Sequence, residues 1–126
     1  MGGYTATIND GREIFIPSWP VNVQLENLTN VSKYLGAGHV INMASLDLQA
    51  VKVAIMSAED PAQTAKLIKH FICQVRIDGS KIDESTMDEM FQDNLKVVAE
   101  LFAHVIHSQY ADFFDLGQAK EASPEA

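Results

Sequence analysis

The chain has 126 residues, which suits one domain built around one hydrophobic core. Apolar residues make up 47% of it, too large a share for a disordered protein. The formal net charge of −8 argues against binding to nucleic acid or to anionic lipid, because both require a clustered basic surface.

The sequence also bears on the compartment. Cys73 is the one cysteine, so a disulfide framework within the chain is excluded. Neither a secretory leader nor an apolar run long enough to cross a membrane is visible. We therefore expect a cytoplasmic protein.

The first residues predict a β-hairpin. β-Forming residues alternate over 4–8, Asp10-Gly11 is a strong signal for a tight turn, and 12–16 supply the return strand. Pro17 ends that strand. Because a two-stranded hairpin is only marginally stable by itself, we expect it to pack on the helices that follow.

Two helices have clear boundaries. Pro20 can open the first, and apolar residues recur at helical spacing until Gly36 stops it. Asp60-Pro61 opens another helix with an N-cap acid and a proline in the first turn. Asp78-Gly79 is interpreted as the end of that helix.

The region between these helices is harder to assign. Residues 39–44 are short and mixed in character. Residues 46–56 alternate in part like a strand, but their content of Ala, Leu, Gln and Lys favours a helix that Ser45 caps. Helix is our prediction for 46–56, and strand is the alternative.

The most regular pattern runs from residue 85 to about residue 114 and predicts one long amphipathic helix. Ser85 with Asp88, and Thr86 with Glu89, have capping-box spacing at its start. Thirty helical residues would span roughly 45 Å, more than the diameter of about 35 Å expected for a compact chain of this length. The apolar stripe comprises Met87, Met90, Phe91, Val98, Leu101, Phe102, Val105 and Ile106.

Together these elements predict a mostly helical α+β fold. We expect a single globular domain over 1–116, with a hairpin over 1–17 and a helical body over 20–116. The body is a bundle of about four helices with one long C-terminal helix. Small and polar residues over 117–126 predict a disordered tail.

Two histidine-containing pairs raise the question of a metal site. His70 and Cys73, and His104 and His107, each lie three residues apart on a predicted helix, and four N and S ligands would suit tetrahedral zinc. Helical geometry places both pairs away from the apolar stripes, pointing outward in different directions. We therefore predict solvent-facing side chains, no metal and no cofactor.

No catalytic constellation is evident. Cys73 has His70 near it on one turn, but no motif surrounds either residue. The acids around Asp83 lack the spacing and glycine of a calcium loop, and Gly36-Ala37-Gly38 is a helix stop rather than a phosphate loop. We predict that the protein is not an enzyme.

Two apolar features are candidates for contact with a protein partner. Trp19 lies between two prolines, where it either covers the core or forms an exposed anchor. At the end of the long helix, an aromatic cluster drifts away from the main stripe and either anchors a partner or receives the hairpin. The predicted partner-binding residues are Trp19, Tyr110, Phe113, Phe114 and Leu116.

The layout resembles the small tail assembly chaperones of long-tailed bacteriophages. A short hairpin (residues 9–17) ends in proline, a helical body of about a hundred residues follows, and the C-terminus is acidic. Residues 19–29, followed by 33–36, are similar to such phage proteins. The resemblance implies non-catalytic binding of the tape-measure protein and recruitment of tail-tube subunits, in the host cytoplasm.

Two other classes of function stay open at this point. A structural subunit would be retained in the virion or another assembly, whereas a chaperone leaves. A metal-binding regulatory module would use the His and Cys pairs. The sequence does not identify the partner, the oligomeric state or a frameshifted longer form.

Overall fold

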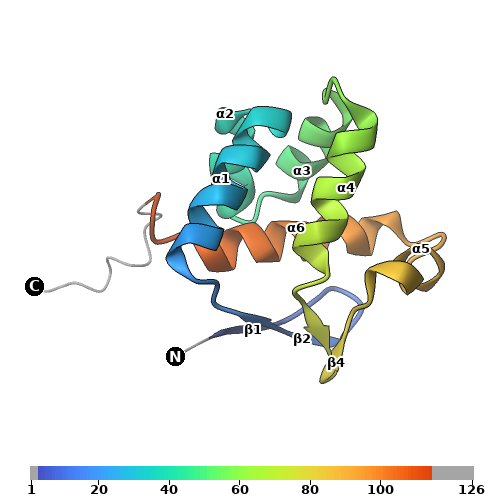
Figure 1. Ribbon diagram of the computed structural model, residues 1–126. Coiled ribbons are helices and arrows are strands. Elements are labelled where there is room, and N and C mark those ends of the chain that lie inside the picture. The colour runs from blue at the N-terminus through green and yellow to red at the C-terminus, as the bar shows by residue number, and fades with distance from the viewer. Residues whose placement is uncertain (1–2, 115–126) are drawn as a thin grey trace, which may run out of the picture.

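Residues 3–114, which the computed structural model describes, form a four-stranded antiparallel sheet and six α-helices (Figure 1). This confirms the predicted α+β, mostly helical class. The elements are β1 (Gly3–Thr7), β2 (Glu13–Pro17), α1 (Val21–Leu35), α2 (Ala37–Ala44), α3 (Leu48–Met56), α4 (Pro61–Ile72), β3 (Arg76–Ile77), β4 (Ser80–Lys81), a 3₁₀ turn (Glu84–Thr86), α5 (Met87–Met90) and α6 (Leu95–Tyr110). The predicted tail at 117–126 lies outside the described residues.

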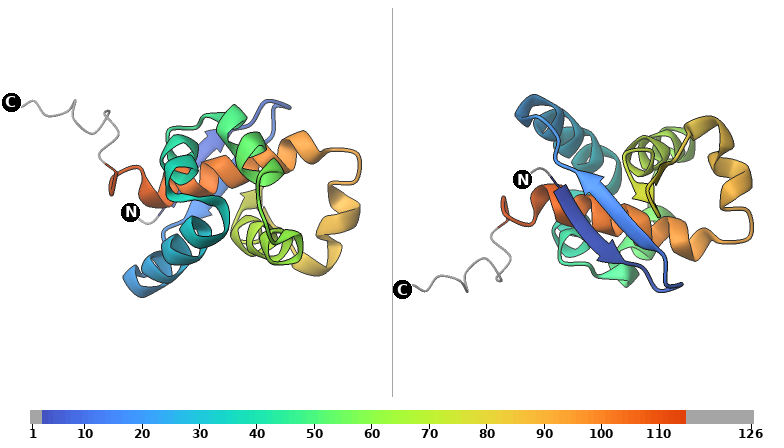
Figure 2. Two further views of the ribbon diagram at one scale, coloured as in Figure 1. Left: turned by 90° about the horizontal axis from the view of Figure 1, so that it is seen from above. Right: turned by 90° about the horizontal axis from the view of Figure 1, so that it is seen from below.

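The helix α6 is the centre of the fold. The sheet lies against one side of it and α1–α4 lie against the other (Figures 1 and 2). Eleven of its residues are buried, including Glu100, His104 and Gln109. A helix that is covered on both sides must bury residues all round its axis, not along a single stripe.

The N-terminal hairpin forms as predicted. β1 and β2 pair antiparallel with Tyr4 opposite Ile16 and Ala6 opposite Ile14. Gly11 has a φ of 94°, the left-handed conformation that the turn requires and that glycine adopts without strain. Ile14 and Ile16 point into the core, so one face of the hairpin packs on the helical body as expected.

The sheet has two more strands than the sequence analysis predicted. β3 pairs with β2, and β4 pairs with β3 through a turn at Asp78 and Gly79. These two residues have φ values of 49° and 87°, as in a type I′ hairpin turn. Our interpretation of Asp78-Gly79 as only a helix end was therefore wrong, since α4 already ends at Ile72.

The helices α1 to α4 agree with most of the predicted boundaries. Gly36, with a φ of 93°, ends α1, and Asp60 caps α4 by accepting a hydrogen bond from the backbone of Gln63. The helix predicted over 46–56 forms over Leu48–Met56, and Asp47 rather than Ser45 supplies its cap. The mixed segment after Gly36 is the short helix α2, which the sequence analysis did not predict.

The predicted long helix from residue 85 to 114 was wrong in extent. It is divided into a 3₁₀ turn, α5 and α6, with a turn at 91–94 in which Asp93 has a φ of 62°. Asp83, rather than Ser85 or Thr86, caps the first piece by accepting from the Ser85 backbone N–H. Asp tolerates the left-handed conformation, so the chain can change direction at Asp93 although the apolar spacing continues.

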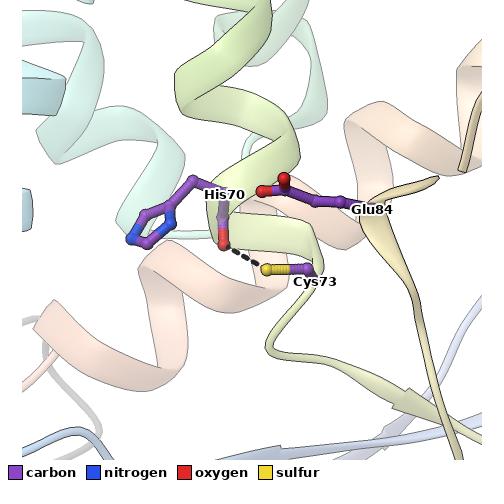
Figure 3. A group of neighbouring side chains, drawn as sticks. All are labelled: His70, Cys73 and Glu84. Carbon is purple, nitrogen blue, oxygen red and sulfur yellow. Dashed lines mark hydrogen bonds between the residues drawn. The ribbon is translucent and has the colours of Figure 1, made fainter.

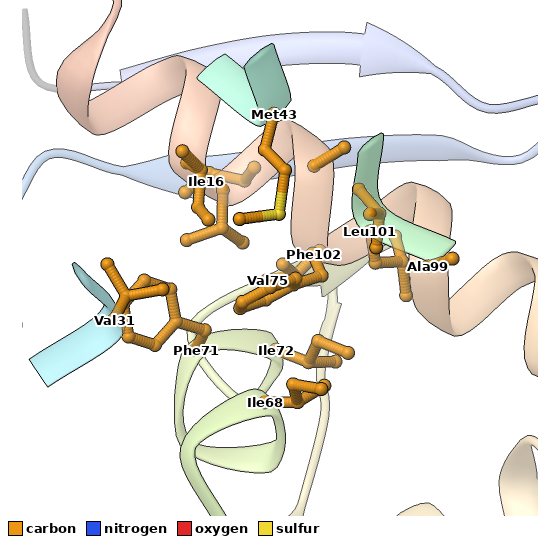
Figure 4. Close-up of a cluster of buried hydrophobic side chains, with 14 of the residues drawn as sticks. Ile16, Val31, Met43, Ile68, Phe71, Ile72, Val75, Ala99, Leu101 and Phe102 are labelled. Atoms are coloured by element: carbon orange, nitrogen blue, oxygen red, sulfur yellow. The ribbon is translucent and has the colours of Figure 1, made fainter. Parts of the chain in front are cut away.

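One hydrophobic core joins the layers (Figure 4). Phe71 of α4 and Phe102 of α6 lie at its centre, with no exposed surface and ring centroids 5.4 Å apart. Ile16 reaches the same core from the sheet and Met43 from α2. Within residues 3–114, no helix is both long and apolar enough to span a membrane.

Candidate functional site

Trp19 and Tyr110, two of the residues predicted to bind a partner, belong to the core. Trp19 is 8% exposed, and its ring packs edge-on against Phe71 and Tyr110. The Tyr110 hydroxyl donates to the backbone carbonyl of Gln24 at 2.7 Å. Burial raises the pKa of Tyr110, which keeps the phenol neutral. Trp19 therefore covers the core in this structure and is not an exposed anchor, the other role considered for it.

Phe113 and Phe114, called here the aromatic pair, lie at the surface beyond the end of α6. Phe113 is 65% exposed, whereas Phe114 is half-buried and packs against the core. Their rings meet edge to face with centroids 5.1 Å apart. The Phe114 backbone N–H donates to the carbonyl of Tyr110, so the pair is held close to the helix. Leu116 lies outside the described residues.

Gln109 connects the aromatic end of α6 to the segment before α1. Its side-chain oxygen accepts from the backbone N–H of Trp19 at 3.2 Å and from the Gln24 amide at 3.1 Å. Its amide nitrogen donates to the carbonyl of Pro17 at 3.0 Å. The sequence analysis did not identify these hydrogen bonds of Gln109. A Gln within an apolar stripe is a signal for them, because a buried polar side chain needs hydrogen-bond partners.

Of the two histidines of α6, His104 is buried and His107 is half-buried, which corrects the prediction that both face solvent. His104 is 9% exposed, and the Tyr4 hydroxyl lies 2.9 Å from its Nδ1. His107 Nδ1 donates to the carbonyl of Ala44 at 2.6 Å. The prediction assumed that α6 packs against one core along a single apolar stripe. In the structure, β1 and α2 also cover the faces of α6 that were expected to be exposed.

Glu100 completes this buried polar row and ties the hairpin loop to α6. Its Oε2 accepts from the backbone N–H of Asn9 at 2.8 Å. The same oxygen lies 4.0 Å from Nε2 of His104, too far for a hydrogen bond. Burial lowers the pKa of His104, and the neighbouring His107 lowers it further.

The lowered pKa of His104 predicts that acid destabilises the fold. The unfolded chain binds the proton more readily, so this contribution to stability is complete above an unfolded pKa of about 6.5 and is lost as the pH falls through the lower folded value. We expect the melting temperature to drop between pH 7.5 and 5.5, and His104→Gln to reduce that drop. Exposed His70→Gln is the matched control, and an equal effect of both variants would contradict the prediction.

Within the described residues, His70 and Cys73 lie near a third possible metal ligand, Glu84 (Figure 3), whereas His104 and His107 belong to no cluster of three possible ligands. His70, Cys73 and Glu84 place their ligand atoms within 4.8 Å of one another. The spacing expected around tetrahedral zinc is about 3.3–3.8 Å. The Cys73 thiol donates to the carbonyl of His70, and burial together with Glu84 raises its pKa, so the thiolate that a metal needs is disfavoured.

An apolar groove of about 380 Å³ lies between α4, α5 and the start of α6. Ile68, Met87 and Phe91 are buried along it. Ala65 and Leu95 line it from exposed positions, and Leu95 is 76% exposed. The turn at 91–94 swings α5 away from the axis of α6, as Figure 2 shows. Residues of α5, the start of α6 and α4 therefore line a shared groove.

Comparison with known proteins identifies the family. The family model described as phage tail assembly chaperone protein, TAC, matches residues 10–122. The chain belongs to the phage tail assembly chaperones. This confirms the resemblance found in the sequence. No curated protein and no solved structure is similar enough to count as a match.

Membership of the tail assembly chaperones indicates which surfaces of the protein to consider as binding sites. A chaperone of tail assembly acts on protein partners. It therefore needs apolar surface that is open in the free protein and can cover apolar parts of a partner. In the described part of the chain, the aromatic pair and the groove beside α5 both present such surface, near opposite ends of α6.

Proposed function

We propose that this tail assembly chaperone binds the tape-measure protein and recruits tail-tube subunits, without catalysis, in the host cytoplasm. The observation that carries the proposal is the exposure of Phe113 just beyond the end of α6, a helix in which eleven of 16 residues are buried. Such a helix is a rigid support, so the aromatic pair can enter an apolar partner surface with little loss of conformational entropy. The net charge of −8 would keep the complex soluble.

The aromatic pair is proposed to contact an apolar helical segment of the tape-measure protein. Exposed aromatic side chains are frequent hot spots, because they bury a large area with few rotatable bonds. Trp19 and Tyr110 support the aromatic pair from the core. Their ring contact and the hydrogen bond from Tyr110 to Gln24 hold the end of α6 against α1. Among the described residues predicted to bind a partner, we thus assign direct contact to the aromatic pair and a supporting role to Trp19 and Tyr110.

Changing Phe113 and Phe114 together to serine should abolish capture of the tape-measure protein. We expect co-purification from co-expressing cells to fall at least about tenfold, since two hot-spot side chains are lost. The helical circular dichroism should be unchanged, because neither residue belongs to the fully buried core. Purified virions of the parent phage should lack the chaperone, whereas a structural subunit would be retained.

The matched control is Met56→Ser, which removes an apolar side chain that is 78% exposed on α3. It should leave capture unchanged. Loss of helical signal in the Phe113/Phe114 variant would show that the pair supports the fold instead. Normal capture by a folded double variant would contradict the assigned contact, and no capture by the unaltered protein would contradict the proposed function.

A further inference from the structure

The strand β1 forms an open edge of the sheet. In the order β1-β2-β3-β4 it has a neighbour, β2, on one side only, and no other segment of the described chain forms a backbone hydrogen bond with it. The opposite edge, β4, is two residues long and includes Lys81, and short or charged edges resist further pairing. β1 has five residues and contains neither a charged residue nor a proline, so it is the edge that can accept another strand.

The pairing with β2 determines which backbone groups of β1 point outward. Residue pairs with and without hydrogen bonds alternate along an antiparallel ladder. Thr7 lies opposite Glu13, and the Glu13 carbonyl is turned away from β1, because it accepts from the Asp78 N–H at 2.8 Å. Thr7, and by alternation Thr5 and Gly3, therefore direct their backbone N–H and C=O groups away from β2.

The face of the sheet that packs on α6 is incomplete beside β1. Tyr4 and Ala6 lie opposite buried residues of β2 on this face, but are themselves only half-buried. The Tyr4 ring meets the half-buried His107 ring edge to face, with centroids 5.4 Å apart. A strand beside β1 would cover these side chains, so its residues on this face should be apolar. Thr5 and Thr7 are exposed on the other face, where polar residues are suitable.

We propose that the outer edge of β1 binds an extended strand of a protein partner, which extends the four-stranded sheet. The added strand pairs antiparallel with β1, the more stable arrangement per residue. Main-chain hydrogen bonds supply the affinity, and alternation of apolar and polar side chains supplies the specificity. The inference rests on the proposed function in taking this strand from a protein of tail assembly, and the contact is separate from the aromatic pair.

A second copy of this chain fits this edge poorly. Antiparallel pairing of two β1 strands about a two-fold axis would place both helical layers on the same side of the joined sheet. His107 contacts Tyr4 of β1 and the carbonyl of Ala44 in α2, so α2 adjoins this edge. In the view from below, α2 and α3 come into sight beyond β1, on the side away from β2 (Figure 2). Helices of the two copies would therefore meet near the axis, whereas an extended segment brings no helical layer with it.

Amide hydrogen exchange measured by NMR on the full chain tests this geometry. In the free protein, the outward amides of Thr5 and Thr7 should exchange fast, whereas the Ala6 amide, which faces β2, should be protected. The probe is a labelled synthetic peptide of about seven residues in which Thr and Val alternate, with a Lys-Lys end for solubility. We expect the peptide to slow exchange of the Thr5 and Thr7 amides at least about tenfold.

Two N-methylated versions of the peptide separate backbone pairing from other binding. In an antiparallel strand whose Val side chains face α6, the Thr amides face β1 and the Val amides face water. Methyl groups on the Thr amides should abolish the protection, and methyl groups on the Val amides should not. Equal protection by the two versions, or none by the unmodified peptide, would overturn the proposal. So would Thr5 and Thr7 amides that are already protected in the free chain, as in a dimer.

Thr5→Pro removes the central outward N–H of β1. Proline is tolerated on an edge strand where its N–H would face solvent, so the melting temperature should change little. Binding of the labelled peptide, followed by fluorescence anisotropy, should weaken at least about tenfold, because the bound strand loses a hydrogen-bond donor and meets the proline ring. Thr5→Val is the matched control, since it keeps the N–H and a branched side chain, and it should bind normally.

The same two variants separate this inference from the proposed function. In cells that co-express the tape-measure protein and the tail-tube subunit, Thr5→Pro should lose one of these partners and Thr5→Val neither. If the unaltered chain and Thr5→Pro capture both partners equally, the assignment of the β1 edge fails and the proposed function stands. If the unaltered chain captures neither partner but binds the peptide at β1, the proposed function fails alone.

Discussion

Replacing Phe71 by alanine should destabilise the fold by about 3–5 kcal/mol, the usual cost of removing a fully buried phenylalanine ring. Phe71 has no exposed surface, and its ring packs edge-on against Trp19 at 5.3 Å and Phe102 at 5.4 Å. The substitution therefore opens a cavity where α4, α6 and the segment before α1 meet. It also removes two aromatic contacts that add to the burial energy.

The loss is measurable by urea denaturation followed by circular dichroism. A natural domain has a stability of about 5–15 kcal/mol, so Phe71→Ala should lower the urea midpoint strongly or leave a partly unfolded protein. Phe113→Ala is the matched control, because the same ring is removed from an exposed position, where the change should be within about 0.5 kcal/mol. Equal destabilisation by the two variants would contradict the central place of Phe71.

Replacing Gln109 by alanine should cost about 2–4 kcal/mol, because buried polar groups lose their partners. Gln109 is 7% exposed and bonds the backbone N–H of Trp19 and the carbonyl of Pro17. Without its amide, these two backbone groups stay buried and unsatisfied unless the segment moves into water. Movement of that segment would release Trp19 from Tyr110 and expose the indole.

Thermal unfolding and tryptophan fluorescence measure the two effects together. Gln109→Ala should lower the melting temperature and shift the Trp19 emission to longer wavelength, whereas Gln63→Ala, at an exposed position of α4, should do neither. A destabilised variant with unchanged Trp19 emission would show that the anchor does not hold this segment. Because Trp19 is the one tryptophan, the emission reports its surroundings directly.

The local features were predictable wherever a short stretch of sequence contains its own structural signal. Asp10-Gly11 predicted the first turn, Gly36 the end of α1, and Asp60-Pro61 the start of α4. The same Asp-Gly signal at Asp78-Gly79 was not recognised as a hairpin, because β3 and β4 are two residues each. Strands this short have no alternation to detect, and they form only because β2 offers an edge to pair with.

The candidate sites were predictable only in part. Phe113 and Phe114 were identified as possible anchors from their position at the end of the helix, but their exposure followed from which neighbours pack on α6. The groove was not predicted. Its buried residues, such as Ile68 and Phe91, belong to ordinary helical stripes, and they face a shared groove only because the chain turns between α5 and α6.

By itself, the sequence determined the class of fold, the hairpin, three of the helix boundaries and the likeness to tail assembly chaperones. Each of these depends on residues close together in the chain or on overall layout and composition. The tertiary structure alone decided that α6 is covered on both faces, that His104 is buried and His107 half-buried, and that the long helix breaks at Asp93. Hydrophobic spacing records which residues prefer burial, but the number of layers that cover them depends on long-range packing.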